Sequence, residues 1–191
     1  MTNIAIFASG NGTNFEAIAA ACQSGKIAAS VVLLVCDKPT AYVVERAKKY
    51  NVPAFVFNPK TYAHKADYET EICNLLQANH VDLVCLAGYM RIVGDVLLSK
   101  YEGRMLNIHP SLLPAFKGAH AIDDAFNFGV KVFGVTVHLI DNTLDGGTIV
   151  AQRAFEYHGN DRNEVEAKIH SIEYELYVEA IQQLSSTKYH N

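Results

Sequence analysis

Short apolar runs alternate with amphipathic stretches along most of the chain. Runs without polar interruption and rich in β-branched residues are typical of strands that are covered on both faces of a sheet. They lie at residues 4–8, 30–36, 54–57, 82–87 and 105–108. Apolar residues at helical spacing lie between them, at about residues 13–23, from 41 onward, and at 61–79, 93–101 and 118–129. We therefore expect strands and helices to alternate as far as about residue 129.

The order of these elements predicts the fold. Repeated strand–helix–strand units are right-handed and build a mostly parallel, twisted sheet with helices on both faces. After residue 129 the pattern changes, because the β-rich runs at 131–140 and 148–156 are separated only by the loop DNTLDGG. No helix fits between them, so this C-terminal portion of the sheet is expected to be antiparallel. A last helix over about 163–184 completes a Rossmann-like α/β fold.

Local signals refine the ends and faces of the helices. Thr13 or Asn14 can cap the first helix with its side chain. The expected inner face of the helix at 118–129 consists of Ala121, Ala125 and Phe128. The tail that begins at residue 185 is expected to be frayed, because chain ends without anchoring contacts are poorly ordered.

Length and composition narrow the classes of protein. The chain has 191 residues, of which 50% are apolar, and a formal net charge of -4. That size suits a single domain over residues 1–191, and the mild acidity argues against a general nucleic-acid binder. No apolar stretch is long enough to span a bilayer, and the N-terminal apolar run lacks the basic start of a signal peptide. We therefore expect a cytoplasmic protein with no nucleic-acid partner and no membrane partner.

The cysteines and histidines do not predict a metal site. The four cysteines are Cys22, Cys36, Cys73 and Cys85. They form no CxxC pair and lie inside apolar or helical patterns, so reduced and packed thiols are expected rather than a disulfide framework. The histidines lack metal-binding spacing such as HExxH. We expect no metal ion.

A glycine-rich turn, Ser9-Gly10-Asn11-Gly12-Thr13-Asn14, follows the first strand and precedes the first helix. Glycines let the backbone approach a ligand closely, and the start of a helix offers unpaired N–H groups, so this loop suits a phosphate. It is neither the dinucleotide fingerprint, whose third glycine is missing, nor a Walker loop, whose Lys-Ser/Thr is missing. A tight turn with no ligand is an equally good interpretation of the loop alone.

Two polar side chains lie at the end of the strand that precedes Pro110. Asn107 and His109 are two residues apart and therefore project to the same side of that strand. Parallel sheets bind ligands beyond the carboxyl ends of their strands. An amide donor beside an imidazole can stabilise a developing oxyanion and transfer a proton. On spacing alone, a structural pair bonded to the backbone is the more common outcome.

Asp145 precedes the paired glycines of the loop LDGG. A carboxylate held beside His109 would favour the charged imidazolium and make the ring a better acid and oxyanion partner. An aspartate at this place can equally serve as a turn residue that bonds to its own backbone. The pattern alone does not show that Asp145 and His109 meet.

Four motifs together resemble one enzyme family. GNGTNF, AGYMRIV, LNIHPSLLPAFKGAHA and LDGG, in this order and at these separations, are similar to the phosphoribosylglycinamide formyltransferases, the folate-dependent family of purine synthesis. The resemblance extends from Ile4 to the final helix. NIHPSLLP is specific for the wider group of formyl-folate hydrolases and transferases. The GNGTN loop and the short chain narrow the resemblance to the members that act on glycinamide ribonucleotide. The implied fold is a single formyltransferase domain.

The resemblance implies a set of site residues. The catalytic trio would be Asn107, His109 and Asp145. The residues that bind the phosphate and ribose of the substrate would be Gly12, Thr13, Asn14 and Glu173, although a solvated glutamate on a helix face is a fair alternative for the last. The folate-binding residues would be Lys65, Met90, Arg91, Ile92, Val93 and Asn107. Tyr89 stands where many members carry phenylalanine, and His120 and His138 match histidines that we expect to be structural or to support the site.

The implied reaction transfers the formyl group of 10-formyltetrahydrofolate to the amine of glycinamide ribonucleotide. Residues 1–100 would form the substrate- and phosphate-binding half and residues 101–191 the catalytic and folate-binding half, in a monomer or homodimer. A formyltetrahydrofolate hydrolase and a non-catalytic nucleotide- or folate-binding module are the alternatives. A dinucleotide-dependent reductase fits poorly because of the glycine pattern, although Asp37 after the second strand could imitate the acidic residue of that class.

Overall fold

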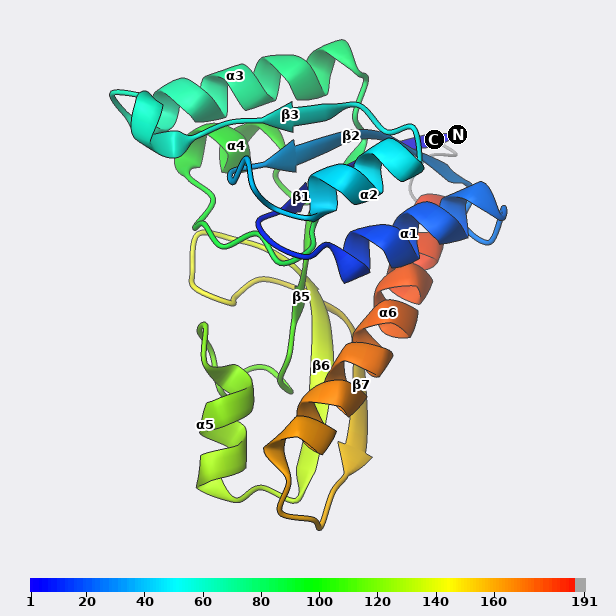
Figure 1. The fold of residues 1–191 in the computed structure, drawn as a ribbon, viewed down its shortest axis with the longest axis vertical. Helices are drawn as coiled ribbons and strands as arrows, with labels where there is room; N and C mark the ends of the chain where they lie inside the picture. The colour runs from blue at the N-terminus through cyan, green and yellow to red at the C-terminus, as the bar shows by residue number, and fades with distance from the viewer. Residues whose placement is uncertain (188–191) are drawn as a thin grey trace.

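A computed structural model of the chain describes residues 1–187, which form one sheet with helices on both faces (Figure 1). The strands are β1 (Thr2–Ala8), β2 (Ala29–Cys36), β3 (Ala54–Val56), β4 (Leu83–Leu86), β5 (Met105–His109), β6 (Val132–Leu139) and β7 (Ile149–Glu156). The helices are α1 (Thr13–Gln23), α2 (Val43–Lys49), α3 (Lys65–Ala78), α4 (Asp95–Lys100), α5 (Ala121–Phe128) and α6 (Arg162–Thr187), with a 3₁₀ turn at Pro59–Thr61.

The sheet order is β3-β2-β1-β4-β5-β6-β7. The pairs from β3 to β5 are parallel, whereas β5 with β6 and β6 with β7 are antiparallel. The predicted fold class is therefore confirmed, including the antiparallel C-terminal portion. The reversal of strand direction after β5 brings β6 directly beside the strand that carries Asn107 and His109.

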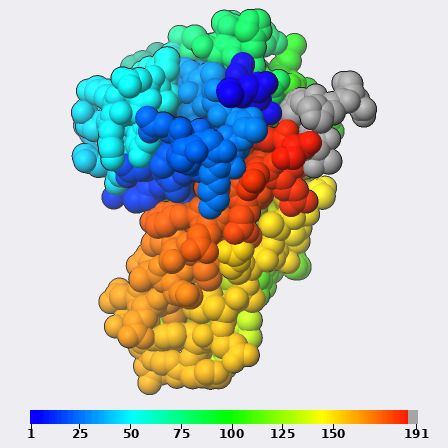
Figure 2. Space-filling view, turned by 90° about the vertical axis from the view of Figure 1, so that its right-hand side faces the viewer, coloured from blue at the N-terminus to red at the C-terminus, as the bar shows by residue number. Residues whose placement is uncertain are grey.

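Each face of the sheet is buried under a different group of helices. Ile4 and Ile6 of β1 point into the larger core with side chains from α1, α2, α5 and α6, and Ala5 and Phe7 point into the second core with α3 and α4. Burial on both faces explains why these strands are apolar without alternation. Figure 2 shows α6, in orange and red, lying against α1, in blue.

The strand order reverses between β1 and β4, and we use the word crevice for the region beyond the carboxyl ends of these two strands. The chain leaves β1 toward β2 on one side, and β4 pairs with β1 on the other side. Ligands of open α/β sheets bind at such a point, beyond the carboxyl ends of the strands. The glycine-rich loop follows β1 and the Met90–Val93 segment follows β4, so both border this crevice.

Three local expectations were wrong. Neither Thr13 nor Asn14 caps α1, since Gly12 occupies the cap position in a left-handed conformation and makes no side-chain cap bond. Phe128 is not on the inner face of α5. It is 80% exposed, and among the aromatic pairs within residues 1–187 its ring meets only that of Phe116, in a T-shaped arrangement. The last helix continues to Thr187, so residues 185–187 are helical, while residues 188–191 of the expected frayed tail lie outside the described residues.

The cysteines are free thiols, and the helices over residues 1–187 are not membrane spans. Over residues 1–187, every helix is too short or too polar to cross a bilayer. Cys22 is half-buried, the other three cysteines are buried, and all four are free thiols. Within the same range, His, Cys, Asp and Glu side chains nowhere gather in a group of three that could hold a metal ion.

Candidate active site

The imidazole of His109 and the carboxylate of Asp145 lie side by side. His109 ends β5 and is buried, and Asp145 stands in the loop between β6 and β7 with a left-handed backbone. Their atoms Nδ1 and Oδ1 are 3.6 Å apart. Asn107 lies two residues earlier on β5, on the same face as His109. The structure thus brings Asp145, which is distant in the sequence, to the pair formed by Asn107 and His109.

Both ring nitrogens of His109 face oxygen atoms. Nε2 lies 2.9 Å from the carbonyl oxygen of Phe116, and Nδ1 faces Asp145. A carbonyl oxygen only accepts hydrogen bonds, so Nε2 carries a proton, whereas the 3.6 Å between Nδ1 and the carboxylate is too long for a hydrogen bond. The backbone N–H of Gly118 donates to Oδ2 of Asp145 at 2.6 Å, which fixes the carboxylate against the segment that follows β5.

A second histidine, His138, fixes the orientation of the Asn107 amide. His138 is the cross-strand partner of Asn107 on β6, and its Nε2 lies 3.1 Å from the amide nitrogen. Its Nδ1 lies 2.7 Å from the carbonyl oxygen of Gly146, so Nδ1 carries the proton and Nε2 accepts from Asn107. Burial lowers the pKa of His138, which favours this neutral form. One amide hydrogen of Asn107 is thereby used, and the hydrogen bonds found within residues 1–187 give the amide nitrogen no second partner.

We expect the neutral state of His138 to make the protein less stable in acid. The unfolded chain binds a proton here from about pH 6.5 downward, whereas the folded chain does so only at a lower pH. Stability from this group is therefore present above about pH 6.5 and is lost as the pH falls through the lowered pKa. In His138→Gln, whose amide can still accept from Asn107 and donate to Gly146, the loss on acidification should be smaller.

Urea unfolding of both proteins at neutral and at mildly acidic pH measures this difference. His158→Gln is the matched control, because His158 is exposed on the chain after β7 and contacts only the carboxylate of Glu156 at 3.7 Å among the ion pairs of residues 1–187. Equal pH dependence in wild type and His138→Gln would show that His138 is not held neutral in the folded protein.

The glycine-rich loop is held by α2. The N–H of Val43 donates to the carbonyl oxygen of Gly10 at 3.1 Å, and a Cβ at Gly12 would collide with the Val43 side chain. Gly12 also has a φ of 79°, a conformation that glycine adopts without strain. Arg46 donates to the backbone oxygen of Asn11 at 2.9 Å. The first N–H groups of α1, which have no partner inside the helix, therefore face the crevice from a fixed loop.

Glu173 of α6 lies beside the start of α1. Its side chain is buried, and the amide nitrogen of Asn14 donates to it over 3.5 Å. The ring of His170 lies 2.9 Å from the same carboxylate, and this hydrogen bond raises the pKa of His170. The side-chain oxygen of Asn14 is buried and has no hydrogen-bond partner within residues 1–187. The alternative of a solvated surface glutamate therefore fails, and polar atoms from α1 and α6 meet next to the glycine-rich loop.

The segment Met90–Val93 presents apolar side chains to solvent on an anchored backbone. Met90 is 70% exposed and Ile92 is 76% exposed, whereas Val93 is buried. The backbone N–H of Met90 donates to the hydroxyl of Ser9 at 2.9 Å, and Arg91 donates to a carboxylate at the end of β2. Large exposed apolar side chains next to a crevice are typical of a ligand-binding surface.

Lys65 and Tyr89 flank this segment. Lys65 begins α3, and its ammonium lies 3.8 Å from Glu69, whose carboxylate accepts from the backbone N–H of Gly94. The basic residue therefore lies near the end of the segment. The ring of Tyr89 packs edge-on against Phe7 with centroids 5.3 Å apart, and burial raises the pKa of its phenol. The hydroxyl that distinguishes tyrosine from phenylalanine thus stays protonated.

Sequence reasoning did not identify several residues that support the site. The supporting contacts each involve a backbone atom of a loop that meets its partner only in the folded chain. They are those of Arg46 with Asn11, of Ser9 with Met90 and of Gly118 with Asp145. No spacing rule in the sequence marks such contacts. For Arg46 the only available signal is its place on the helix that follows the second strand.

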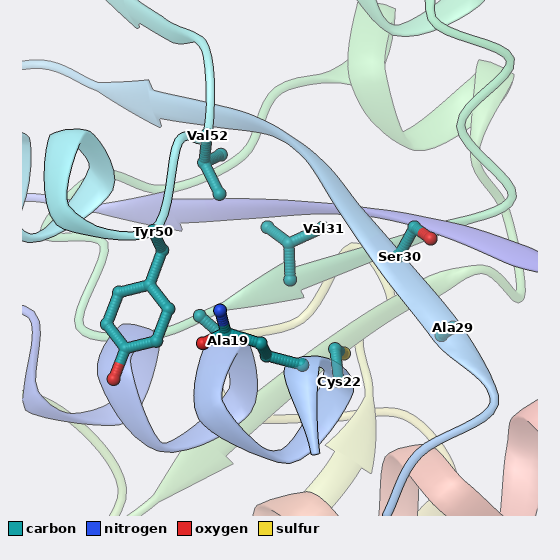
Figure 3. Close-up of a pocket in the computed structure, with 8 residues that line it drawn as sticks. Ala19, Cys22, Ala29, Ser30, Val31, Tyr50 and Val52 are labelled. Atoms are coloured by element: carbon teal, nitrogen blue, oxygen red, sulfur yellow. The ribbon is translucent and has the colours of Figure 1, made fainter. Parts of the chain in front are cut away.

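A cavity elsewhere on the molecule is lined by none of these site residues. A cavity of about 210 Å³ lies between α1 and β2, and Figure 3 shows it lined by Ala19, Val31, Tyr50 and Val52 among others. It shares no lining residue with the site. Its one thiol, that of Cys22, has a pKa raised to about 11 by burial and is therefore a poor nucleophile.

Comparison with known proteins gives a consistent result. Residues 2–181 match the family model described as formyl transferase. A phosphoribosylglycinamide formyltransferase of Bacillus subtilis (strain 168) is 50% identical over 96% of this chain and 95% of its own length. The crystal structure of glycinamide ribonucleotide transformylase 1 from Geobacillus kaustophilus has a TM-score of 0.94 at 50% identity, over 96% of this chain and 98% of its own. A phosphoribosylglycinamide formyltransferase structure from Bacillus halodurans has a TM-score of 0.94 at 47% identity, over 97% and 96% of the two chains.

Proposed function

The chain belongs to the formyl transferase family, among its phosphoribosylglycinamide formyltransferases, and from this premise we propose how its side chains perform the reaction. The enzyme transfers the formyl group of 10-formyltetrahydrofolate to the amine of glycinamide ribonucleotide in purine biosynthesis. The observation that carries the mechanism is the meeting of the His109 ring with the Asp145 carboxylate beside Asn107, at the end of β5.

The acceptor substrate binds between α1 and α6. Its phosphate lies against the N–H groups of Gly12, Thr13 and Asn14, where the helix start favours negative charge. Its ribose hydroxyls donate to the buried carboxylate of Glu173 and to the unpartnered oxygen of Asn14. The glycinamide amine then points along the crevice toward β5. This arrangement explains why two acceptor oxygens are buried at this place.

The formyl donor binds against Met90, Arg91, Ile92 and Val93, with Lys65 near its acidic tail and Asn107 near its formyl group. The exposed side chains of Met90 and Ile92 provide apolar surface for the pterin, and the backbone provides hydrogen-bonding groups for its polar edge. The donor and acceptor therefore meet at Asn107 and His109. Holding the two reactants in contact makes a covalent enzyme intermediate unnecessary.

The neutral amine attacks the formyl carbon, and negative charge develops on the former formyl oxygen. The second amide hydrogen of Asn107 and the Nδ1–H of His109 donate to that oxygen. The Nδ1–H is not committed to Asp145, because 3.6 Å is too long for a hydrogen bond, and so it can donate to a substrate oxygen placed beside it. Each such donor typically contributes about 3 to 4 kcal/mol of barrier reduction. Asp145 accepts the amine proton, with a water molecule, and the proton passes to N10 as the carbon–nitrogen bond to the folate breaks.

The remaining assignments follow the same proposal. Residues 1–100 contribute most of the acceptor site, and residues 101–191 contribute the catalytic trio and part of the folate site. We propose a cytoplasmic monomer or homodimer whose partners are its two substrates, with no nucleic acid and no membrane. The mechanism needs no metal ion.

A coupled assay with purified enzyme tests the function directly. We expect formylglycinamide ribonucleotide and tetrahydrofolate to appear in equal amounts when both substrates are supplied. Omitting glycinamide ribonucleotide should abolish release of tetrahydrofolate. Release of formate and tetrahydrofolate at an undiminished rate without the acceptor would indicate a hydrolase instead.

A further inference from the structure

The polypeptide after β4 is fixed at three successive points. The N–H of Met90 donates to the hydroxyl of Ser9, Arg91 donates to Asp37, and the N–H of Gly94 donates to Glu69. Two of these three anchors are buried carboxylates, and the mechanism above uses neither of them. A buried carboxylate is costly unless it is paired and hydrogen-bonded, so its presence needs a reason.

Asp37 is the less satisfied of the two. It follows the last residue of β2 and is 3% exposed. Its Oδ2 accepts a hydrogen bond from Nε of Arg91 at 2.7 Å. Its other oxygen, Oδ1, is buried and has no hydrogen-bond partner within residues 1–187. The side chain of Arg91 is partly exposed, so it could leave for solvent if the carboxylate were absent. The ion pair therefore restrains the Arg91 side chain, which also interacts with Tyr68.

Glu69 acts on the other end of the segment. It lies on α3 and is buried, and its Oε1 accepts from the N–H of Gly94 at 2.7 Å. A Cβ at position 94 would lie 2.6 Å from the Oε2 of Glu69, so the close approach depends on glycine. Burial raises the pKa of Glu69, and the Gly94 N–H and the Lys65 ammonium oppose that shift. The carboxylate thus connects α3 to the turn that begins α4.

We propose that Asp37 and Glu69 are positioning residues for the formyl donor. They hold residues 90–93 in a single conformation in which Met90 and Ile92 stay exposed before the donor arrives. Fixing a segment before binding removes the ordering cost that the ligand would otherwise have to offset. This inference rests on the proposed donor site, and it adds residues that do not touch the donor. Asp37 thus supports a folate segment and does not bind the ribose of a dinucleotide.

Asp37→Ala and Asp37→Asn give the test, with Glu179→Ala as control. Glu179 of α6 also forms an ion pair with an arginine at 2.7 Å, but its partner is Arg153 of β7, outside the donor segment. We expect Asp37→Ala to raise the KM for 10-formyltetrahydrofolate about tenfold, with the KM for glycinamide ribonucleotide within about twofold. Asp37→Asn should have a smaller effect, because its amide oxygen still accepts from Arg91. The control should match wild type.

Hydrogen exchange of the amides at 90–93, measured with and without tetrahydrofolate, separates this inference from the proposed function. In wild type the ligand should slow exchange there, and in Asp37→Ala the unliganded segment should exchange faster. No protection by tetrahydrofolate in wild type would contradict the donor site itself. Protection in wild type, with unchanged KM and unchanged exchange in Asp37→Ala, would leave the donor site standing and overturn the positioning role.

A purely structural role predicts a different pattern. Equal increases in the two KM values together with a lower melting temperature would indicate general destabilisation and overturn the inference. Circular dichroism checks the fold of each variant. If Asp37→Ala does not fold, Asp37→Asn and Glu69→Ala decide, since each should raise the donor KM selectively.

Discussion

Replacing His109 with alanine is expected to lower kcat by about a hundredfold to a thousandfold, the usual effect of removing one oxyanion donor. The KM values should change much less, because the ring contacts neither the proposed phosphate site nor the pterin segment. The buried ring leaves a small cavity next to Phe116, so the variant should fold with modest loss of stability. Steady-state kinetics with both substrates, and circular dichroism on the same preparation, provide the measurement.

His158→Ala is the matched control, because that ring is exposed and lies on the chain after β7. It should retain wild-type kcat. Near-normal turnover in a folded His109→Ala protein would remove His109 from the mechanism. The catalytic contribution would then rest on Asn107 and on the positioning of the two substrates alone.

Asp145→Asn should lower kcat by about a hundredfold, within the range for loss of a general acid–base group. The amide oxygen of asparagine can still accept from the N–H of Gly118, so the loop should keep its position. The negative charge that faces Nδ1 of His109 is lost, together with the base that accepts the amine proton in the proposed mechanism. Steady-state rates with both substrates measure the loss.

Asp124→Asn, an exposed change in the first turn of α5, controls for the loss of one charge. Rates measured under the same conditions compare the three proteins, and the control should match wild type. An unchanged rate would contradict both roles.

The sequence was sufficient for the architecture because the architecture depends on local patterns. Buried strands such as β1 are apolar on both faces, and the loop after β6 is too short for a helix, so the parallel and antiparallel parts could be told apart. Phe128 shows the limit of this reasoning. It has the helical spacing of a core residue, but α5 ends at Gly129 on the rim of the molecule, where no core remains to cover it.

The site was predictable only in part, for a similar reason. Asn107 and His109 share one strand, so their proximity follows from the period of a β-strand. The approach of Asp145 depends on the register between β5, β6 and the loop beyond, which no single segment specifies. His138 was expected to support the site, but its bond to Asn107 is a cross-strand contact that only the fold reveals. Motif resemblance supplied what local patterns could not.

The packing of α6 against α1 has a consequence for biosynthesis of the protein. A ribosome-bound chain that has reached β7 already contains the glycine-rich loop together with Asn107, His109 and Asp145. It lacks Glu173, and the inner residues of α1 that α6 covers are still exposed to water. Because apolar surface that is exposed during folding favours aggregation, we expect the docking of α6 to be the step that protects this face of the nascent chain.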